Sequence, residues 1–243
     1  MKKFYFLLLL FPLSLCAQIL DEYPKGKDFY AGGMINLYQD IHQIIVDKNL
    51  PACENRKEVY NVKLLLTKEA QIKFVTDFDT INISKNKCAY DLSQKLLREL
   101  KNNTWNPAEV RGQKFDSVVE FFVFPDHLFE KYTKDYDPGK FYMPATYQGG
   151  KLKFDKDLHA NFMTIFTDYD VNGSFYLDFY IDENGKITDP SLHPKVRNSL
   201  FTSEVYRTLK RMNKKWNPAI LDGIPVKSKI SIPMTFSKSY SSS

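Results

Sequence analysis

The sequence predicts an α+β protein made of two tandem copies of one small domain, each with the element order α-β-β-α-β. A Trp-Asn-Pro-Ala block, followed by three residues and a glycine, begins at Trp105 and again at Trp216, 111 residues later (216 − 105). A Tyr-x-Gly-Gly block likewise begins at Tyr30 and at Tyr147. Between these blocks, apolar residues recur at helical and at strand spacing in the same order. Such long-period similarity indicates a duplicated structural unit.

Residues 1–17 have the composition of a secretory signal peptide. Two lysines precede an apolar stretch, 4–15, which is shorter than the roughly 20 residues that span a bilayer. We expect cleavage after Ala17 and export to the periplasm. Two alternatives remain open. One is a lipoprotein signal, in which Cys16 is acylated and holds the protein at the outer membrane, and the other is an uncleaved membrane anchor.

The repeated blocks set the expected domain boundaries. The mature chain of 226 residues (243 − 17) is long enough for one large domain or two small ones, and the repeat favours two. We expect repeat 1 at residues 30–125, a linker at 126–146, repeat 2 at 147–236 and a disordered Ser-rich tail at 237–243.

Apolar spacing orders the elements within each repeat. In repeat 1 we expect a helix at 34–46, strands at 59–66 and 72–76, a helix around 92–100 and a strand at 117–124. In repeat 2 we expect a helix around 154–165, strands at 174–181 and 186–188 joined by an Asn184-Gly185 turn, a helix around 205–212 and a strand at 226–236.

The charge balance argues against nucleic acid as a partner. The formal net charge of +5 falls to +3 without the two lysines of the leader (32 basic and 29 acidic residues). No basic stripe interleaved with aromatic residues runs along the sequence, and no glycine-rich phosphate loop is present. We therefore expect no nucleic acid and no bound cofactor.

The two cysteines outside the leader, Cys53 and Cys88, both lie in repeat 1. An even number of cysteines in an exported protein favours a disulfide. One cysteine precedes the first expected strand and the other opens the following helix, so the two can meet. We predict a Cys53–Cys88 bridge, and two separately buried thiols are the alternative.

The remaining polar residues form no catalytic or metal-binding pattern. An Asp-x-His triplet occurs in both repeats, around His42 and His159, but residues two apart on a helix point in different directions and cannot share a metal. Residues 168–173 open like a calcium loop, yet Phe179 stands where the closing glutamate is needed. We expect no metal and no enzymatic activity.

The blocks of repeat 2 resemble the TonB C-terminal domain family. The shared pattern is Tyr-x-Gly-Gly, a hairpin with an Asp-x-Asn-Gly turn, Trp-x-Pro-Ala followed by Gly-x-Pro-Val, and a last strand with Pro-x-x-Phe. Repeat 2 carries it at Gly149, Gly150, Asn184, Gly185, Trp216, Pro218, Ala219, Gly223, Pro225, Val226, Pro233 and Phe236. Repeat 1 is a weaker copy, which lacks the turn glycine and the Pro-Val pair but keeps Gly32, Gly33, Trp105, Pro107, Ala108 and Gly112.

The resemblance implies that each repeat is a three-stranded antiparallel sheet packed on two helices. In energy transducers this domain lies in the periplasm and captures an extended peptide of an outer-membrane transporter along a sheet edge. Those transducers also carry a membrane anchor and a long Pro-rich spacer. We expect this chain to have neither, and to be a soluble envelope relative that is linked to transmembrane transport through its partner.

Six residues of the repeated block are predicted to be structural. A tryptophan that follows a helix and adjoins a Pro-Ala turn can fill the core of a small domain. Exposed tryptophans that stack on a ligand are the alternative. The structural set comprises Trp105, Trp216, Pro107, Pro218, Gly112 and Gly223.

The last strand of repeat 2 is the predicted partner-binding segment. Pro233 has no N–H to donate, which places the strand at a sheet edge or a bulge. A free edge can accept an extended segment through main-chain hydrogen bonds. The lysines have a second interpretation, because charged side chains also protect edges from aggregation. The predicted segment comprises Val226, Lys227, Ser228, Lys229, Ile230, Ser231 and Ile232.

These observations predict a non-enzymatic adaptor of the cell envelope. Its expected partner is an envelope protein, for example a peptide of an outer-membrane transporter, and contact with the membrane comes only through that partner. The alternative is a structural or self-associating protein whose sheet edges pair between the repeats or in a homodimer, which leaves no peptide site.

Intact-mass measurement of the exported protein tests the leader and the bridge together. Cleavage after Ala17 gives a chain that begins at Gln18, whereas acylation adds the mass of lipid to Cys16. Reduction of a Cys53–Cys88 bridge adds the mass of the two thiol hydrogens. A chain that still begins at Met1 contradicts the cleaved leader, and a mass unchanged by reduction contradicts the bridge.

Overall fold

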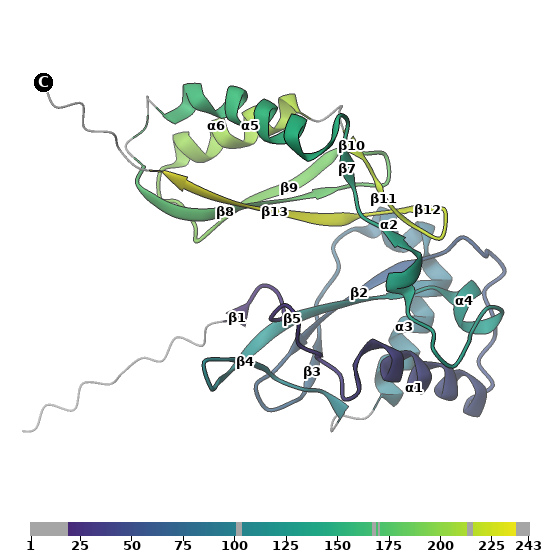
Figure 1. The fold of residues 1–243 in the computed structure, drawn as a ribbon. Coiled ribbons are helices and arrows are strands. Elements are labelled where there is room, and N and C mark those ends of the chain that lie inside the picture. The colour runs from purple at the N-terminus through teal and green to yellow at the C-terminus, as the bar shows by residue number, and fades with distance from the viewer. Residues whose placement is uncertain (1–18, 101–103, 167–168, 170, 213–215, 237–243) are drawn as a thin grey trace, which may run out of the picture. The chain divides into compact units, whose positions relative to one another are not determined.

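The structure is a computed structural model that describes residues 19–100, 104–166, 169, 171–212 and 216–236. The predicted leader and tail lie outside these residues. The chain divides into two compact units, Met1–Tyr136 and Asp137–Ser243, here called unit 1 and unit 2. Both combine helices with antiparallel strands, so the predicted α+β class is confirmed (Figure 1). No helix among the described residues is long and apolar enough to cross a membrane.

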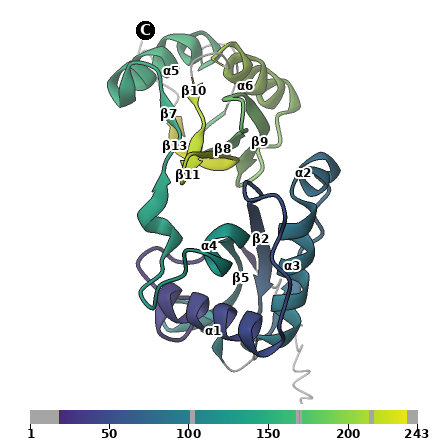
Figure 2. The ribbon, with the colours of Figure 1, turned by 90° about the vertical axis from the view of Figure 1, so that its right-hand side faces the viewer.

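Unit 1 is a sheet that packs against helices. Its strands run in the order β1-β5-β2-β3, with β2 antiparallel to both neighbours and β1 parallel to β5, while β4 forms a hairpin with β5. Helix α3 packs on β2 and β5, and α1 packs on α3 (Figure 2). The elements are β1 (Ile19–Leu20), α1 (Gly33–Asp47), β2 (Tyr60–Leu66), β3 (Ile72–Phe74), α2 (Thr80–Lys85), α3 (Lys87–Glu99), β4 (Ala108–Val110), β5 (Gln113–Val123) and α4 (Pro125–Phe129).

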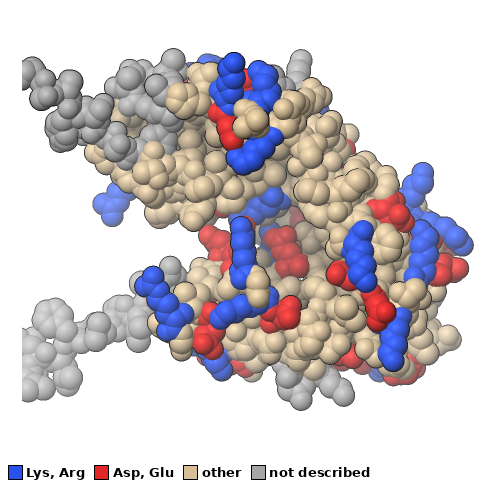
Figure 3. Space-filling model, in the orientation of Figure 1, with Lys and Arg blue, Asp and Glu red and all other residues tan. Residues whose placement is uncertain are grey.

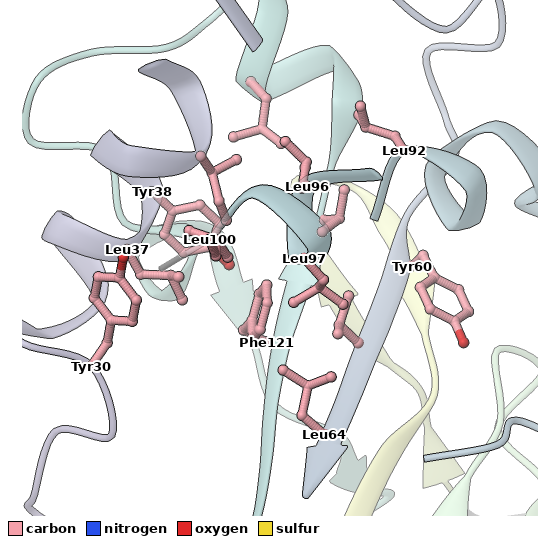
Figure 4. Close-up of a cluster of buried hydrophobic side chains, with 14 of the residues drawn as sticks. Tyr30, Leu37, Tyr38, Tyr60, Leu64, Leu92, Leu96, Leu97, Leu100 and Phe121 are labelled. Carbon is pink, nitrogen blue, oxygen red and sulfur yellow. The ribbon is translucent and has the colours of Figure 1, made fainter. Parts of the chain in front are cut away.

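Strand alternation and helical spacing together build the core of unit 1. Every second residue of β2 is buried, because successive side chains of a strand point to opposite faces of the sheet. Leu64 of β2 and Phe121 of β5 are buried in one cluster with Leu37 and Tyr38 of α1 and Leu96 of α3 (Figure 4). The apolar positions expected on two helices and two strands therefore meet in a single core.

Unit 2 has a three-stranded antiparallel sheet in the order β13-β8-β9, with α5 and α6 on one face (Figures 1 and 2). Two short ladders accompany it: β7 pairs with β10, and β6 pairs with β11 of the β11–β12 hairpin. The elements are the 3-10 helix η2 (Pro138–Phe141), β6 (Tyr142–Met143), β7 (Thr146–Tyr147), α5 (Gly150–Phe166), β8 (Gly173–Ile181), β9 (Ile187–His193), α6 (Ser199–Arg211), β10 (Trp216–Asn217), β11 (Ala219–Leu221), β12 (Ile224–Val226) and β13 (Ser228–Phe236).

The segment 126–146, expected as a linker, contributes to both units. Leu128 and Tyr136 belong to the core cluster of unit 1. From Asp137 onward the chain forms η2, β6 and β7 of unit 2. The segment is therefore more than a connection, because two of its side chains pack in the core of unit 1.

Equivalent residue pairs occur in the two units at the spacing of the sequence blocks. In each unit the tyrosine of the Tyr-x-Gly-Gly block pairs with the tryptophan, and the middle strand pairs with the last strand in the same register. The equivalent pairs are Tyr30–Trp105 and Tyr147–Trp216, Leu64–Val119 and Phe179–Ile230, and Ala108–Phe115 and Ala219–Val226.

Cys53 and Cys88 are joined by a disulfide, as predicted. The bridge fastens the loop that follows α1 to the first turn of α3. The two cysteines are 35 residues apart. Closing a loop of this length restricts the unfolded chain and contributes about 3–4 kcal/mol to stability in a chain-entropy treatment.

The turn between β8 and β9 needs glycine for a steric reason. Gly185 has a φ of 74°, and a Cβ at this position would lie 2.4 Å from the carbonyl oxygen of Trp216. Ala70 takes the equivalent place in unit 1 and has a φ of 62°. The left-handed conformation therefore persists in unit 1 without the glycine that normally favours it.

Replacing Gly185 by alanine is expected to destabilise unit 2 by about 2–4 kcal/mol, because the left-handed conformation and the contact with the Trp216 carbonyl both oppose a Cβ. Gly223→Ala is the matched control. Gly223 also has a positive φ, 80°, but a Cβ there meets nothing within 4 Å, so we expect a loss of only about 1–2 kcal/mol. Urea denaturation compares the two, and equal losses would show that the contact with Trp216 is unimportant.

Candidate strand-pairing edge

Strand β13 lies at the edge of the sheet of unit 2. It pairs with β8 along its whole length, from Ser228 opposite Ile181 to Phe236 opposite Gly173. In the part of the chain that the structure describes, no strand pairs with its other side. Of the predicted partner-binding segment, Val226 ends β12, Lys227 connects the two strands, and the other five residues belong to β13.

The side chains of this segment alternate between the core and the outer face of the sheet. On the inner side, Val226 and Ser228 are buried, and Ile230 and Ile232 pack against the core of unit 2. On the outer side, Lys227 and Lys229 are half-buried and Ser231 is exposed. Side chains thus occupy the two faces, and the edge itself consists of backbone groups.

Both lysines extend across the outer face toward acidic residues of the neighbouring strands. Lys229 Nζ lies 3.1 Å from Asp178 Oδ2 on β8, and Lys227 Nζ lies 2.8 Å from Asp189 Oδ2 on β9. Lys227 Nζ also lies 5.0 Å from the ring centre of Tyr180. The two ammonium groups therefore point away from the edge of β13 and do not shield its backbone.

The two lysine–aspartate pairs differ in burial. The side chain of Asp178 is 6% exposed, whereas that of Asp189 is 62% exposed. A buried carboxylate depends on its charged partner, because it has lost most of its contact with water. Asp178 was missed by the sequence reasoning. The available signal was an acidic residue in an otherwise apolar strand; in the structure it lies opposite Ser231 of β13, two residues from Lys229.

Pro233 indicates which backbone groups of β13 face the open edge. Proline has no N–H and is tolerated where a strand does not donate to its neighbour. Pro233 pairs with Tyr176 of β8, so we infer that positions of the same parity direct their N–H and C=O groups away from β8. Within the predicted segment these positions are Lys229 and Ser231.

The corresponding edge in unit 1 already carries an added strand. Ile19 and Leu20 form β1, which pairs in parallel with Asp116 and Ser117 of β5 on the side opposite β2. Ile19 and Leu20 precede the predicted repeat 1, and no local sequence pattern marks so short a strand. The fold of unit 1 therefore accepts strand addition at the edge that is unpaired in unit 2.

Both tryptophans lie in the cores. Trp105 is 2% exposed and Trp216 is 8% exposed. The ring of Tyr30 packs edge-on against Trp105 at 5.1 Å between ring centres, and Tyr147 packs in the same way against Trp216 at 5.2 Å. Both tryptophan side chains are therefore buried and pack against a tyrosine of the same unit.

Each of these tyrosines also fastens the following helix. The Tyr30 hydroxyl donates to Asp40 Oδ2 at 2.6 Å, and the Tyr147 hydroxyl donates to Asp157 Oδ2 at 2.8 Å. Burial, together with the hydrogen bond to Asp40, raises the pKa of Tyr30 above its ordinary value. The repeated aspartate of the Asp-x-His triplet is thus the acceptor of a protonated tyrosine.

The remaining structural residues form a tight hairpin after each tryptophan. Pro107 and Pro218 are half-buried. Gly112 has a φ of 78° after Arg111 at 53°, and Gly223 has a φ of 80° after Asp222 at 45°. Positive φ at both central positions is the pattern of a type I′ turn, which suits a two-residue hairpin. The tryptophan block therefore ends in a turn that leads into the last strand.

The histidines and cysteines take structural places. His42 stacks on Tyr132 with ring centres 3.7 Å apart, and its Nδ1 lies 2.9 Å from the Leu128 carbonyl oxygen, whereas His159 is exposed. Glu58 lies close to both sulfurs of the disulfide, but those sulfurs are bonded to each other and a Glu58 oxygen accepts from the Ala89 N–H at 3.0 Å. Asp168 and Asp170 of the calcium-like segment lie outside the described residues.

Basic and acidic side chains are interspersed on the face shown in Figure 3. Elsewhere in the described chain, several opposite charges pair at helical spacing, as in Lys87–Asp91, Lys151–Asp155 and Lys153–Asp157. This distribution agrees with the small net charge and gives this face no continuous positive surface.

Comparison with known families identifies residues 169–237 as a match to the C-terminal domain of the Gram-negative bacterial TonB protein. The matched segment runs from the residues before β8 through β13 and includes the Trp216 block and the candidate edge. The resemblance predicted for repeat 2 is confirmed for this segment. No curated protein and no solved structure matches the chain.

The burial of Asp178 gives the two lysines different expected contributions to stability. Lys229→Met should cost about 1–3 kcal/mol, because it leaves a buried carboxylate without its cation. Lys227→Met should cost less than about 0.5 kcal/mol, because its partner is exposed. Thermal and urea unfolding of both variants test this difference. Equal effects would mean that Asp178 does not depend on Lys229.

Proposed function

We propose that the protein is a non-enzymatic adaptor of the bacterial cell envelope, built from two tandem TonB-C-like domains. In this proposal β13 of the second domain binds an extended segment of an outer-membrane protein by strand addition. The observation that carries the proposal is that β13, within the segment that matches the TonB family, is an edge strand with one side unpaired in the described part of the chain.

The tandem arrangement is supported by the equivalent pairs in the two units. The tyrosine–tryptophan bridge, the register between the middle and last strands, and the tyrosine–aspartate hydrogen bond all occur twice. We place the two domains at residues 30–125 and 147–236, with the flanking segments packed on them. This arrangement accounts for both sequence blocks with one duplicated fold.

Strand addition is supported by unit 1, where β1 already pairs with the equivalent edge. We propose that the partner segment likewise runs parallel to β13, accepting and donating hydrogen bonds at Lys229 and Ser231. Because the ammonium groups of Lys227 and Lys229 are engaged by aspartates, recognition rests on the main chain more than on charged side chains of the partner.

The predicted leader and the match to the TonB family both support a location in the cell envelope. Domains of the TonB family are periplasmic, and we propose that cleavage of residues 1–17 releases this chain into the same compartment. The Cys53–Cys88 disulfide is consistent with an oxidising environment. Acylation at Cys16 is the alternative that the mass measurement distinguishes.

The test removes one edge-facing N–H while keeping the rest of the strand. Ser231→Pro removes that donor, and Ser231→Ala removes only the exposed hydroxyl. We expect the wild type and Ser231→Ala to retain the same outer-membrane proteins from detergent-solubilised envelopes. Ser231→Pro should lose at least about tenfold in binding, since added strands are held by main-chain hydrogen bonds. Synthetic peptides of the captured proteins then give the affinities.

Equal binding by Ser231→Pro, with an unchanged melting temperature, would contradict strand addition at β13. Light scattering after size-exclusion chromatography separates the proposal from self-association. A monomeric wild type supports an edge available to a partner. A dimer that Ser231→Pro converts to a monomer would instead show that the edge pairs with a second copy of the chain.

A further inference from the structure

The leading segment, which precedes Tyr30 in unit 1 and Tyr147 in unit 2, pairs with a different strand in each unit. In unit 1, Ile19 and Leu20 pair with Asp116 and Ser117 on the β5 edge. Shifted by the spacing of the tryptophan blocks, 111 residues (216 − 105), those two positions of β5 correspond to Lys227 and Ser228 beside the open edge of unit 2. The same edge is therefore filled by the chain itself in unit 1.

In unit 2 the segment before the tyrosine is directed elsewhere. Tyr142 and Met143 pair with Leu221 and Ile220 of β11. This pairing holds the leading segment on the hairpin, so it does not reach β13. The path of the leading segment thus determines whether the edge carries an added strand.

In the leading segment of unit 1, Tyr23 is anchored by hydrogen bonds, whereas the first two described residues, here called the tip, form only the short strand β1. Tyr23 is fastened, since its hydroxyl donates to the Asn106 carbonyl oxygen at 3.0 Å and to the Asp28 carbonyl oxygen at 3.1 Å. The tip pairs through only two residues, and Ile19 is 47% exposed. Strand β1 thus consists of two residues, and Tyr23 anchors the chain that follows it. We call residues 19–22 the arm.

The arm covers only part of the β5 edge. Strand β5 extends to Val123, and among the described residues no strand pairs with residues 118–123 on the side opposite β2. The Phe122 carbonyl oxygen in this stretch accepts from the Tyr38 hydroxyl of α1 at 2.6 Å. The pairing that an incoming strand can replace is therefore that of the arm with Asp116 and Ser117.

We propose that the β5 edge is a second strand-accepting site, which the arm occupies within the same chain, so that an external segment binds there only when the arm leaves. The external segment has the chemistry of the arm, an aliphatic pair followed by acidic residues, and runs parallel to β5. This inference rests on the proposed function only in that both sites use strand addition.

A tethered arm competes strongly with any free segment. A short linker gives an attached strand an effective concentration of about millimolar. A free peptide of equal intrinsic affinity is therefore excluded from β5 until its own concentration exceeds that level. Removing the arm should make the β5 edge available at a much lower peptide concentration.

The test compares the mature chain with a variant that lacks residues 18–22 and so keeps Tyr23 as its first residue. The probe is a capped synthetic peptide of residues 18–22, Gln-Ile-Leu-Asp-Glu. Backbone amide resonances of Asp116 and Ser117 report binding at β5, and those of Lys229 and Ser231 report binding at β13. We expect the peptide to shift the β5 resonances of the truncated chain at a concentration at least about tenfold lower than in the intact chain.

A second variant tests the same expectation in a full-length chain, so that the result does not depend on folding of the truncated chain. Leu20→Pro in the full-length mature protein weakens the pairing of the arm, and Ile19→Val is the control that keeps it. The peptide should shift the β5 resonances in Leu20→Pro but not in Ile19→Val. Melting temperatures near that of the wild type confirm that both variants fold.

Equal titration of β5 in the intact and truncated chains, or no shift of β5 in a folded truncated chain, would overturn the proposal. The β13 resonances keep this outcome separate from the proposed function. Shifts at Lys229 and Ser231 without shifts at β5 would support strand addition in unit 2 and refute the second site. Shifts at β5 alone would support the second site whether or not β13 has a partner.

Discussion

In each unit a buried tyrosine packs edge-on against a buried tryptophan and donates its hydroxyl to an aspartate about two turns into the long helix. The tyrosine stands before the first helix and the tryptophan stands before the last hairpin, so this contact joins the beginning of the domain to its end. Large aromatic side chains bury more apolar area than other residues. The hairpin that follows Trp216 then leads directly into β13, so the position of the candidate edge depends on this contact.

A three-stranded sheet has two edge strands, and an unpaired edge is a place where another strand can add. In unit 1, β1 pairs with part of this edge, whereas unit 2 holds its leading segment on β11, and among the described residues no strand pairs with the side of β13 opposite β8. Lys227 and Lys229 do not cover this edge, because they extend across the sheet to Asp189 and Asp178. The two units therefore present different edges, and the difference arises from the short segments that precede each tyrosine.

The features that could be predicted from the sequence depend on local rules. Glycines at the turns, apolar spacing along helices and strands, and the tryptophan blocks each act within a few residues, and the cysteine count anticipated the Cys53–Cys88 bridge. The features that were missed depend on contacts between distant residues. The pairing of Ile19 with Asp116 and the burial of Tyr136 involve residues that carry no distinctive local pattern. Likewise, Lys229 was visible in the sequence, but its partner Asp178 became apparent only once β8 and β13 were paired.

Unit 1 has alanine where unit 2 has a turn glycine, and it also has a disulfide, so the free energies of these two features can be compared. Ala70 holds a left-handed conformation where unit 2 has Gly185, which costs about 1–2 kcal/mol for a residue with a Cβ. The Cys53–Cys88 bridge contributes about 3–4 kcal/mol and so more than offsets that strain. Unit 2 has no cysteine and retains the glycine, which a Cβ cannot replace without moving the Trp216 carbonyl. A covalent link thus stabilises unit 1 where it lacks this glycine, whereas unit 2, which carries the open edge, has the glycine and no disulfide.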